Sequence, residues 1–363
     1  MNSKRLLSLD AFRGFTIAAM ILVNNPADWG HVFTPLLHAE WNGITPTDLI
    51  FPFFLFIVGV SIAVAYSKRL HAGDKKSNLV KKIVWRSVKI FLVGVALSYI
   101  HVLNFEDLRI VGVLQRIAIV FLICSLLYLF SSTKAQIIIG SALLLIYFIA
   151  MCFIPTPGYG KVMLEPGVNM AAWIDSFIVP GKMWQGSWDP EGFFSTIPAI
   201  STGIFGILVG QLIMSELKVE TKIIWLFITG FMVTIAGLVW GWIFPINKNL
   251  WSSSYVLFTG GLASLTLAVS IYLVDVLKKT KTAQIGIIFG ANAITIYVLA
   301  DLLNFVFYQM MIGSYSLSNY FMQWFQSTGI MMKTGSFLYA LMYIGVLFVP
   351  AYILYRKKVF IKL

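Results

Sequence analysis

The chain has 363 residues, of which 59% are hydrophobic and only 12% are charged. Soluble globular domains carry roughly 25% charged residues, so this composition argues against an ordinary soluble enzyme and predicts a surface that faces lipid. The net charge of +12 would suit a nucleic-acid-binding protein, but basic residues also gather on the cytoplasmic side of membrane proteins. We therefore expect membrane lipid and no nucleic acid as a partner, and a single transmembrane domain over residues 1–363.

Ten stretches are long and apolar enough to cross a bilayer, which takes about 20 mostly apolar residues in a helix. They are residues 7–25, 46–66, 83–101, 110–130, 136–154, 193–214, 223–244, 253–275, 284–308 and 336–355. The expected fold is therefore all-α, a polytopic transmembrane helical bundle with about ten spans. The short amphipathic stretch 315–330 favours an interfacial or re-entrant helix instead. The first span is a poor signal peptide, so we expect it to remain uncleaved.

Lysines and arginines divide unequally between the two sets of connections. One set holds 18 of the 27, beginning with Lys4 and Arg5 and ending with Lys362, whereas the alternate set holds 5 and the spans hold 4. Cytoplasmic connections are enriched in Lys and Arg. We therefore predict cytoplasmic N- and C-termini, a cytoplasmic connection at 67–82, and an extracytoplasmic loop at about 155–192 together with the segment 26–45.

The common signatures of soluble enzymes are missing from the sequence, including GxSxG, the Walker loop, GxGxxG after a strand and HExxH. Cys124 and Cys152 both lie in apolar runs, which is typical of small buried hydrophobic residues rather than of a disulfide or metal ligands. We therefore expect no metal. Ionisable groups inside a bilayer are costly and are candidates for function. The candidate functional residues are therefore the polar residues within the spans and at their borders.

The densest group of polar side chains lies just before the second span. Its members are His38, Glu40, Trp41, Asn42, Thr45, Thr47 and Asp48. Histidine accepts and returns a proton near neutral pH, so His38 is a candidate catalytic residue. Asn24 and Asn25 end the first span, where they could stabilise an oxyanion or only cap the helix; both interpretations stay open.

Buried arginines form the second group. Asp10 and Arg13 are three residues apart on one face of the first span, which fits a structural ion pair. Alternatively, Arg13 forms a cytoplasm-facing basic pocket with Arg86 and Arg116 for a phosphate-bearing cofactor, with Asp10 beside it. The residues alone thus indicate a membrane enzyme or transporter with an outward polar site and an inward basic one.

Several runs of the sequence, taken in order, resemble the catalytic domain of the heparan-α-glucosaminide N-acetyltransferase family. They are SLDAFRGFTIAAMILVNNPADWGHVFTPLLHAEWNGITPTDLIFPFFLFIVGVSI, LRIVGVLQRIA, DPEGFFSTIPAI, FPINKNLWSSSYVLFTGGL and GANAITIYV. The combination of LDxFRG, HAxWNG and GVLQRIA is specific to this family. The resemblance implies a bacterial-type member in the inner (cytoplasmic) membrane, which we expect to be the bare form without the N-terminal lumenal domain of the animal lysosomal enzyme.

The resemblance implies acetyl transfer from acetyl-CoA to the amine of a terminal glucosamine, across or within a membrane. It implies that His38 of HAxWNG is the active-site histidine and that Asn24, ten residues after the glycine of FRG, is a catalytic asparagine. Asp10 and Arg13 match the family motif LDxFRG. Asp48 joins His38 and Asn24 as a third catalytic candidate.

The segment 25–37 departs from the animal pattern and adds His31, which puts the acceptor in doubt. We expect the acceptor sugar to be bordered by residues of this region, namely His31, Glu40, Trp41 and Asn42. The tryptophans would stack on sugar faces or form an interfacial aromatic belt. Two other functions stay open, an O-acyltransferase of a cell-surface glycan and a transporter, and so does a homodimer.

Overall fold

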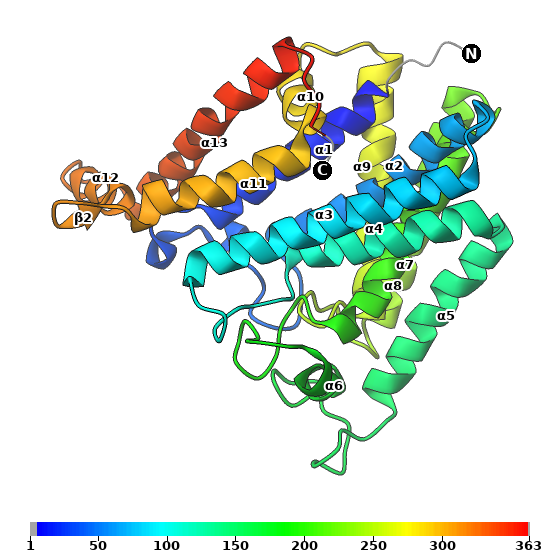
Figure 1. Ribbon diagram of the computed structural model, residues 1–363, viewed down its shortest axis with the longest axis horizontal. Helices are drawn as coiled ribbons and strands as arrows, with labels where there is room; N and C mark the ends of the chain where they lie inside the picture. The colour runs from blue at the N-terminus through cyan, green and yellow to red at the C-terminus, as the bar shows by residue number, and fades with distance from the viewer. Residues whose placement is uncertain (1–5, 362–363) are drawn as a thin grey trace. The chain divides into compact units, whose positions relative to one another are not determined.

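The computed structural model describes residues 6–361, and its regular structure is almost entirely helical (Figure 1). Lys4, Arg5 and Lys362, which contribute to the predicted charge asymmetry, lie outside the described residues. The helices are α1 (Leu7–Asn24), α2 (Ile50–His71), α3 (Lys76–Val102), α4 (Val113–Phe130), α5 (Thr133–Cys152), α6 (Met170–Ile178), α7 (Phe193–Met214), α8 (Val219–Trp240), α9 (Ser253–Ser270), α10 (Gln284–Ala291), α11 (Ala293–Asn304), α12 (Leu317–Gln326) and α13 (Met332–Arg356), and the strands are β1 (Met311–Ile312) and β2 (Tyr315–Ser316).

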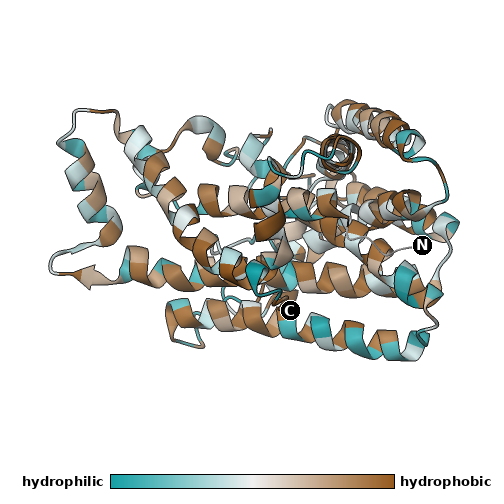
Figure 2. Ribbon diagram, turned by 90° about the horizontal axis from the view of Figure 1, so that it is seen from above, coloured by the Kyte–Doolittle hydropathy of each residue, from teal (hydrophilic) through white to brown (hydrophobic). Residues whose placement is uncertain are grey.

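Nine of the helical segments in residues 6–361 are long and apolar enough to cross a membrane, and the bent pair of α10 and α11 makes ten if it forms one span. Apolar residues run along the lengths of the long helices (Figure 2). Helices suit this setting because lipid offers no hydrogen-bond partners to the backbone. The structure thus confirms the predicted all-α polytopic bundle of about ten spans.

The predicted span 284–308 is broken in the structure. Helices α10 and α11 meet at 81°, and Asn292 lies at the break. Its side-chain amide donates to the carbonyl of Val359 at 3.0 Å and accepts from the N–H of Ile361 at 2.8 Å. The asparagine therefore ties the end of the chain to the bend, a long-range contact that hydropathy does not reveal.

Residue contacts divide the chain into two compact units. Unit 1 comprises residues 1–39, 44–54 and 269–363, and unit 2 comprises residues 40–43 and 55–268. Both units are discontinuous in sequence. The chain passes from unit 1 to unit 2 within α2, after Phe54, and returns to unit 1 near the end of α9. That residues 1–363 act as one transmembrane domain stays a prediction.

In unit 1, α1 and α10 pack with their backbones in direct contact. A Cβ atom at Gly14 would lie 1.7 Å from the carbonyl oxygen of Gly286, and one at Gly290 would lie 1.9 Å from that of Asp10. Small residues allow this close approach between membrane helices. The packing places the polar first turns of α1 directly against α10, and α13 lies against both helices.

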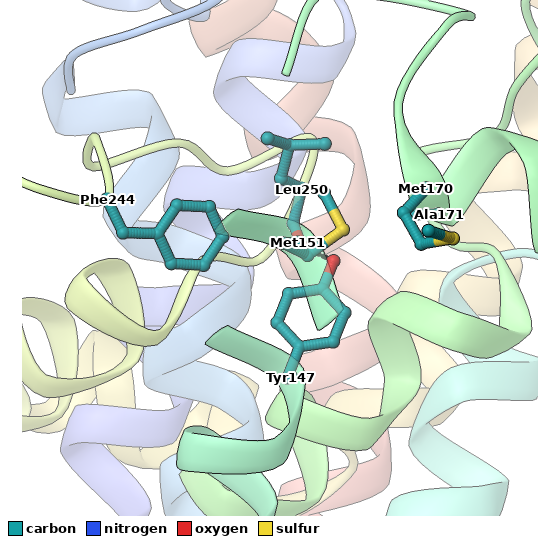
Figure 3. Packing of buried hydrophobic residues seen from close by; sticks show 6 residues of the cluster. All are labelled: Tyr147, Met151, Met170, Ala171, Phe244 and Leu250. Atoms are coloured by element: carbon teal, nitrogen blue, oxygen red, sulfur yellow. Dashed lines mark hydrogen bonds between the residues drawn. The ribbon is translucent and has the colours of Figure 1, made fainter. Parts of the chain in front are cut away.

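In unit 2, the long connection between α5 and α7 is anchored by a buried apolar cluster (Figure 3). The cluster consists of Tyr147, Met151, Met170, Ala171, Phe244 and Leu250. The Tyr147 hydroxyl donates to the carbonyl of Leu250 at 2.6 Å, which joins α5 to the connection before α9. The segment 155–192 is therefore an ordered part of unit 2 that contains α6, a helix the sequence did not predict.

The orientation of the bundle stays a prediction and is open to a labelling test. In a protein whose Cys124 and Cys152, both free thiols, have been replaced, single cysteines go to the exposed positions Ser77 and Lys161. A membrane-impermeant maleimide added to intact cells should label Lys161→Cys and not Ser77→Cys, because connections rich in Lys and Arg are expected to face the cytoplasm. Both should label after permeabilisation. If only Ser77→Cys is labelled in intact cells, the predicted orientation is wrong and the chain crosses the membrane in the opposite sense.

Candidate active site

A histidine and an aspartate are paired just before α2, in unit 1. The Nδ1 atom of His38 lies 2.7 Å from Oδ1 of Asp48. The His38 side chain is 46% exposed, whereas that of Asp48 is 1% exposed. The imidazole is therefore accessible to a reactant while the carboxylate beneath it is not. The sequence placed both residues in one polar group, and the structure makes them a hydrogen-bonded pair.

The short 3-10 helix at Pro46–Leu49 fixes the Asp48 carboxylate. Thr45 precedes this helix and Asp48 is its third residue, the position from which an acidic side chain reaches back to the helix start. Oδ2 of Asp48 accepts from the backbone N–H groups of Thr45 and Ala39, both at 3.0 Å. These bonds stabilise the buried negative charge and aim Oδ1 at His38.

This arrangement sets the chemistry of the imidazole. A carboxylate that accepts from Nδ1–H holds the proton on that nitrogen and makes Nε2 the basic one. The same carboxylate stabilises the imidazolium that forms when Nε2 takes a proton, as in the histidine–aspartate pairs of acyl-transfer enzymes. His38 and Asp48 can therefore act together as a general base and its orienting partner.

The two asparagines at the end of α1 have different surroundings. Asn25 is buried and donates from its side chain to the carbonyl of Ile21 at 2.8 Å, so it caps the helix. Asn24 is exposed and lines a small recess of about 90 Å³ in unit 1. Capping by Asn25 leaves Asn24 as the residue with a side chain open to a ligand.

His31 belongs to a separate histidine–aspartate pair in unit 1. Its Nδ1 lies 2.6 Å from Oδ2 of Asp28. The hydrogen bond with His31, followed by one from the N–H of Gly30, holds the pKa of Asp28 below its usual value. Both side chains of this pair are more than 40% exposed. His31 is therefore paired with Asp28 and belongs to a different pair from His38. Glu40, the first residue of unit 2, is exposed.

The Trp41 and Asn42 side chains contact other parts of unit 2. The indole N–H of Trp41 donates to the carbonyl of Leu164 at 3.0 Å, and its ring meets that of Trp188 edge to face at 5.1 Å. Asn42 accepts from the side chain of Asn247 at 3.1 Å. The half-buried Trp41 therefore helps to hold the 155–192 segment, and its role toward a sugar stays a prediction.

In unit 1, Asp10 and Arg13 form the predicted ion pair. Arg13 Nη1 lies 3.1 Å from Oδ1 of Asp10 and donates to the carbonyl of Gly290 at 3.3 Å. Arg13 thereby joins α1 to α10. In unit 2, the guanidinium of Arg86 lies 4.8 Å from the ring centre of Phe121, a cation–π contact between α3 and α4.

Arg116 lies in the first turn of α4 and is only 1% exposed. Its Nη2 donates to the carbonyl of Gly192 at 3.0 Å and to the hydroxyl of Ser195 at 2.5 Å, and its face lies 5.0 Å from the Trp251 ring. Among the described residues, its Nε and Nη1 atoms have no hydrogen-bond partner. Burying a charge is costly unless it is paired or hydrogen-bonded, so this arginine is a strong candidate for function.

An aspartate from α6 caps the start of α7 beside Arg116. Asp175 Oδ1 accepts from the N–H of Phe194 at 2.9 Å, and a Cβ atom at Gly192 would lie 1.8 Å from Oδ2. Burial raises the pKa of Asp175 to about 6, although the bond from Phe194 and the charge of Arg116 oppose the rise. The carboxylate partly balances the buried arginine without touching it.

A second charged group, which sequence reasoning missed, precedes α7. Arg109 donates from Nε and Nη2 to the two oxygens of Asp189 at 2.7 and 2.6 Å, and from Nη2 to Glu191 at 2.6 Å. Forked bonds of this kind are among the strongest in proteins. Asp189 and Glu191 are neighbours in the DPEG sequence, but Arg109 lies 80 residues before Asp189. Their interaction could therefore not be predicted from the sequence.

The helical bundle and the His38–Asp48 pair define a polytopic membrane protein with an acid–base dyad at the border of a span. The family described as heparan-alpha-glucosaminide N-acetyltransferase, catalytic, matches residues 5–238, and the chain belongs to this family. It is 28% identical to the mouse heparan-alpha-glucosaminide N-acetyltransferase, covering 100% of this chain and 61% of that protein, and 29% identical to the human protein of the same name, covering 99% and 60%. The chain thus spans about three fifths of these curated relatives.

Proposed function

We propose that the chain is a membrane enzyme that moves an acetyl group from acetyl-CoA to the amine of a terminal glucosamine or a related amino sugar. Membership in the family supports an acetyltransferase, and the names of the mouse and human relatives support an amino-sugar acceptor. The observation that carries the proposal is the hydrogen bond between Asp48 and His38, the first residue of the HAEWNG segment. We place the enzyme in the bacterial cytoplasmic membrane.

His38 acts as the base in the proposed reaction. Nε2 takes the proton that the acceptor nitrogen must lose as this nitrogen attacks the carbonyl carbon of the thioester. A C–N bond forms, the C–S bond breaks, and the proton returns from His38 to the leaving sulfur, so that CoA departs as the thiol. Asp48 stabilises the transient imidazolium. We assign to the exposed amide of Asn24 a hydrogen bond to the oxyanion of the tetrahedral intermediate.

The phosphates of CoA require cationic partners, and Arg116 fits this need. Its Nε and Nη1 atoms have no hydrogen-bond partner among the described residues, and a guanidinium binds phosphate oxygens in a forked geometry. We propose that Arg116 holds a phosphate, and that Arg13 with its partner Asp10, and Arg86, contribute to cofactor binding.

Replacing Arg116 by lysine should weaken acetyl-CoA binding, because lysine keeps the charge but loses the forked geometry. Loss of one charge-assisted hydrogen bond corresponds to roughly a 10- to 100-fold rise in Kd, measured by titration of the purified protein. The matched control is Arg69→Lys, which makes the same change at an arginine of unit 2 outside the proposed site and should leave the affinity unchanged. Unchanged acetyl-CoA affinity in a folded Arg116→Ala protein would assign Arg116 to joining α4 and α7 only.

A panel of acceptors tests the proposed activity. Purified protein with acetyl-CoA should acetylate glucosamine and not glucose, because a neutral amine is a much stronger nucleophile toward a thioester than a hydroxyl group is. Acetylation of hydroxyls with glucose-like acceptors would instead identify an O-acyltransferase. Neither transfer nor hydrolysis of acetyl-CoA, combined with uptake of a sugar into vesicles, would identify a transporter.

A further inference from the structure

We propose that Thr45 is a positioning residue of the His38–Asp48 pair. Its side-chain hydroxyl ties the chain just before His38 to the carboxylate that faces the imidazole. Thr45 acts through the two residues that it connects and does not itself bind a reactant. The inference rests on the proposed function for its effect on acetyl transfer, whereas the contacts that carry it all lie within unit 1.

The Thr45 hydroxyl reaches two acceptors. Its oxygen lies 2.7 Å from the carbonyl oxygen of Leu37, the residue directly before His38, and 3.0 Å from Oδ2 of Asp48. A hydroxyl group has one hydrogen to donate, and one hydrogen can be shared between two acceptors in a three-centre bond. One side chain therefore binds both the chain beside the imidazole and the carboxylate opposite it.

His38 is thereby anchored through the backbone on both of its sides. On one side the N–H of Ala39 donates to Oδ2 of Asp48 at 3.0 Å, and on the other side Thr45 binds the carbonyl of Leu37. The segment has no regular secondary structure here, and the His38 side chain is 46% exposed, so these backbone anchors contribute to the position of the imidazole. Removal of the Thr45 hydroxyl deletes one of the two.

The backbone at Thr45 fixes the direction of this hydroxyl. Thr45 is extended, with φ −114° and ψ 167°, and Pro46 follows it at the start of the 3-10 helix. A residue before proline is restricted to the extended region, and a β-branched side chain is stiff about its first torsion angle. The hydroxyl is therefore preorganised toward its two acceptors and loses little rotamer freedom when it binds them.

A second threonine of the same short helix provides a matched control. Thr47 is buried, and its hydroxyl donates to the carbonyl of Pro35 at 3.2 Å. Both hydroxyls thus bind backbone carbonyls of the preceding segment, but that of Thr45 also contacts Asp48. Thr45→Val and Thr47→Val each remove one hydroxyl and keep the branched shape, so they should lower the melting temperature to similar extents. A difference in activity between them then reports the contact with Asp48.

Acetyl transfer by the purified variants measures the effect on the reaction. Thr45→Val should lower kcat by roughly 10- to 100-fold, the effect of losing a hydrogen bond to a charged group. The KM values for acetyl-CoA and glucosamine should not change, because Thr45 positions the base and binds neither substrate. Thr45→Ser keeps the hydroxyl and should recover most of the rate, and Thr47→Val should keep the wild-type kcat. If Thr45→Val does not fold, Thr45→Ala removes the same hydroxyl and takes its place in the comparison.

Nitrogen NMR of the His38 ring tests the positioning without any acetyl transfer. The protein contains four histidines, and the signals that disappear in His38→Ala identify the His38 ring in protein labelled with nitrogen-15 histidine. Their chemical shifts give the fraction of neutral imidazole that carries its proton on Nδ1. This form should dominate in the wild-type protein, in Thr45→Ser and in Thr47→Val. Thr45→Val should shift the ring toward the form protonated on Nε2, which free histidine prefers.

The two measurements separate this inference from the proposed function. If the His38 ring responds to Thr45→Val and not to Thr47→Val, but the wild-type protein transfers no acetyl group, the positioning role stands and the proposed function fails. If the wild-type protein is active and folded Thr45→Val matches Thr47→Val in kcat and in ring shifts, the proposed function stands and the role of Thr45 is excluded. Failure of Thr45→Ser to recover the rate would also overturn that role.

Discussion

Replacing His38 by alanine should slow acetyl transfer by roughly 10²- to 10⁴-fold, the usual contribution of one acid–base group, while acetyl-CoA still binds. The imidazole is the accessible member of the pair with Asp48, and its loss removes the base without opening a cavity in the buried core. Rates of N-acetylglucosamine formation and acetyl-CoA titrations, both on purified protein, measure the two quantities.

His31→Ala is the matched control, because His31 forms a pair of similar length with Asp28 in the same segment and should cost much less activity. The pH dependence of the alanine variant then separates two roles of His38. If His38 is only a base, high pH should partly rescue His38→Ala, because the acceptor amine is then already neutral. If His38 carries the acetyl group, high pH should not help, and wild-type protein should retain label from acetyl-CoA without an acceptor. Full activity in His38→Ala would exclude both roles and direct attention to Asp48 or Glu40.

Asp48→Asn should be almost as damaging as His38→Ala, with a loss on the order of 10²- to 10⁴-fold, although the fold is retained. The asparagine oxygen can still accept from the N–H groups of Ala39 and Thr45, which leaves its NH₂ group against Nδ1 of His38. Nδ1 must then accept, so the proton moves to Nε2 and the imidazole presents the wrong nitrogen to the acceptor.

Thermal melting of Asp48→Asn and the wild-type protein in detergent distinguishes this effect from unfolding, since the two should melt at similar temperatures. Asp28→Asn changes the other histidine–aspartate pair in the same way and is the matched control, with a much smaller expected loss. A folded Asp48→Asn enzyme with wild-type kcat/KM would show that Asp48 only caps the Pro46–Leu49 helix.

Much of the fold could be predicted because lipid imposes a simple rule. Long apolar stretches must become helices, and residues 6–361 contain nine such segments with a tenth broken at Asn292. The break and α6 could not be predicted, because both depend on contacts between distant residues. Asn292, at the break, hydrogen-bonds to the C-terminal segment, and α6 packs in the apolar cluster around Tyr147.

The residues of the candidate site that lie close together in the sequence could be predicted. His38 and Asp48 are ten residues apart and stood in one polar group, although their hydrogen bond needed the turn at Thr45. Arg116 was singled out as a buried charge, but its contact with Gly192 spans 76 residues.

The most direct test of the acetyltransferase site is a label-transfer assay with acetyl-labelled acetyl-CoA, glucosamine and purified protein. The wild-type protein should place the label in the amide of N-acetylglucosamine, and His38→Ala should do so at least about 100-fold more slowly. A wild-type protein that transfers no label to any amino sugar, or an alanine variant that transfers it at the wild-type rate, would contradict the assignment of His38 and Asp48 as the site of acetyl transfer.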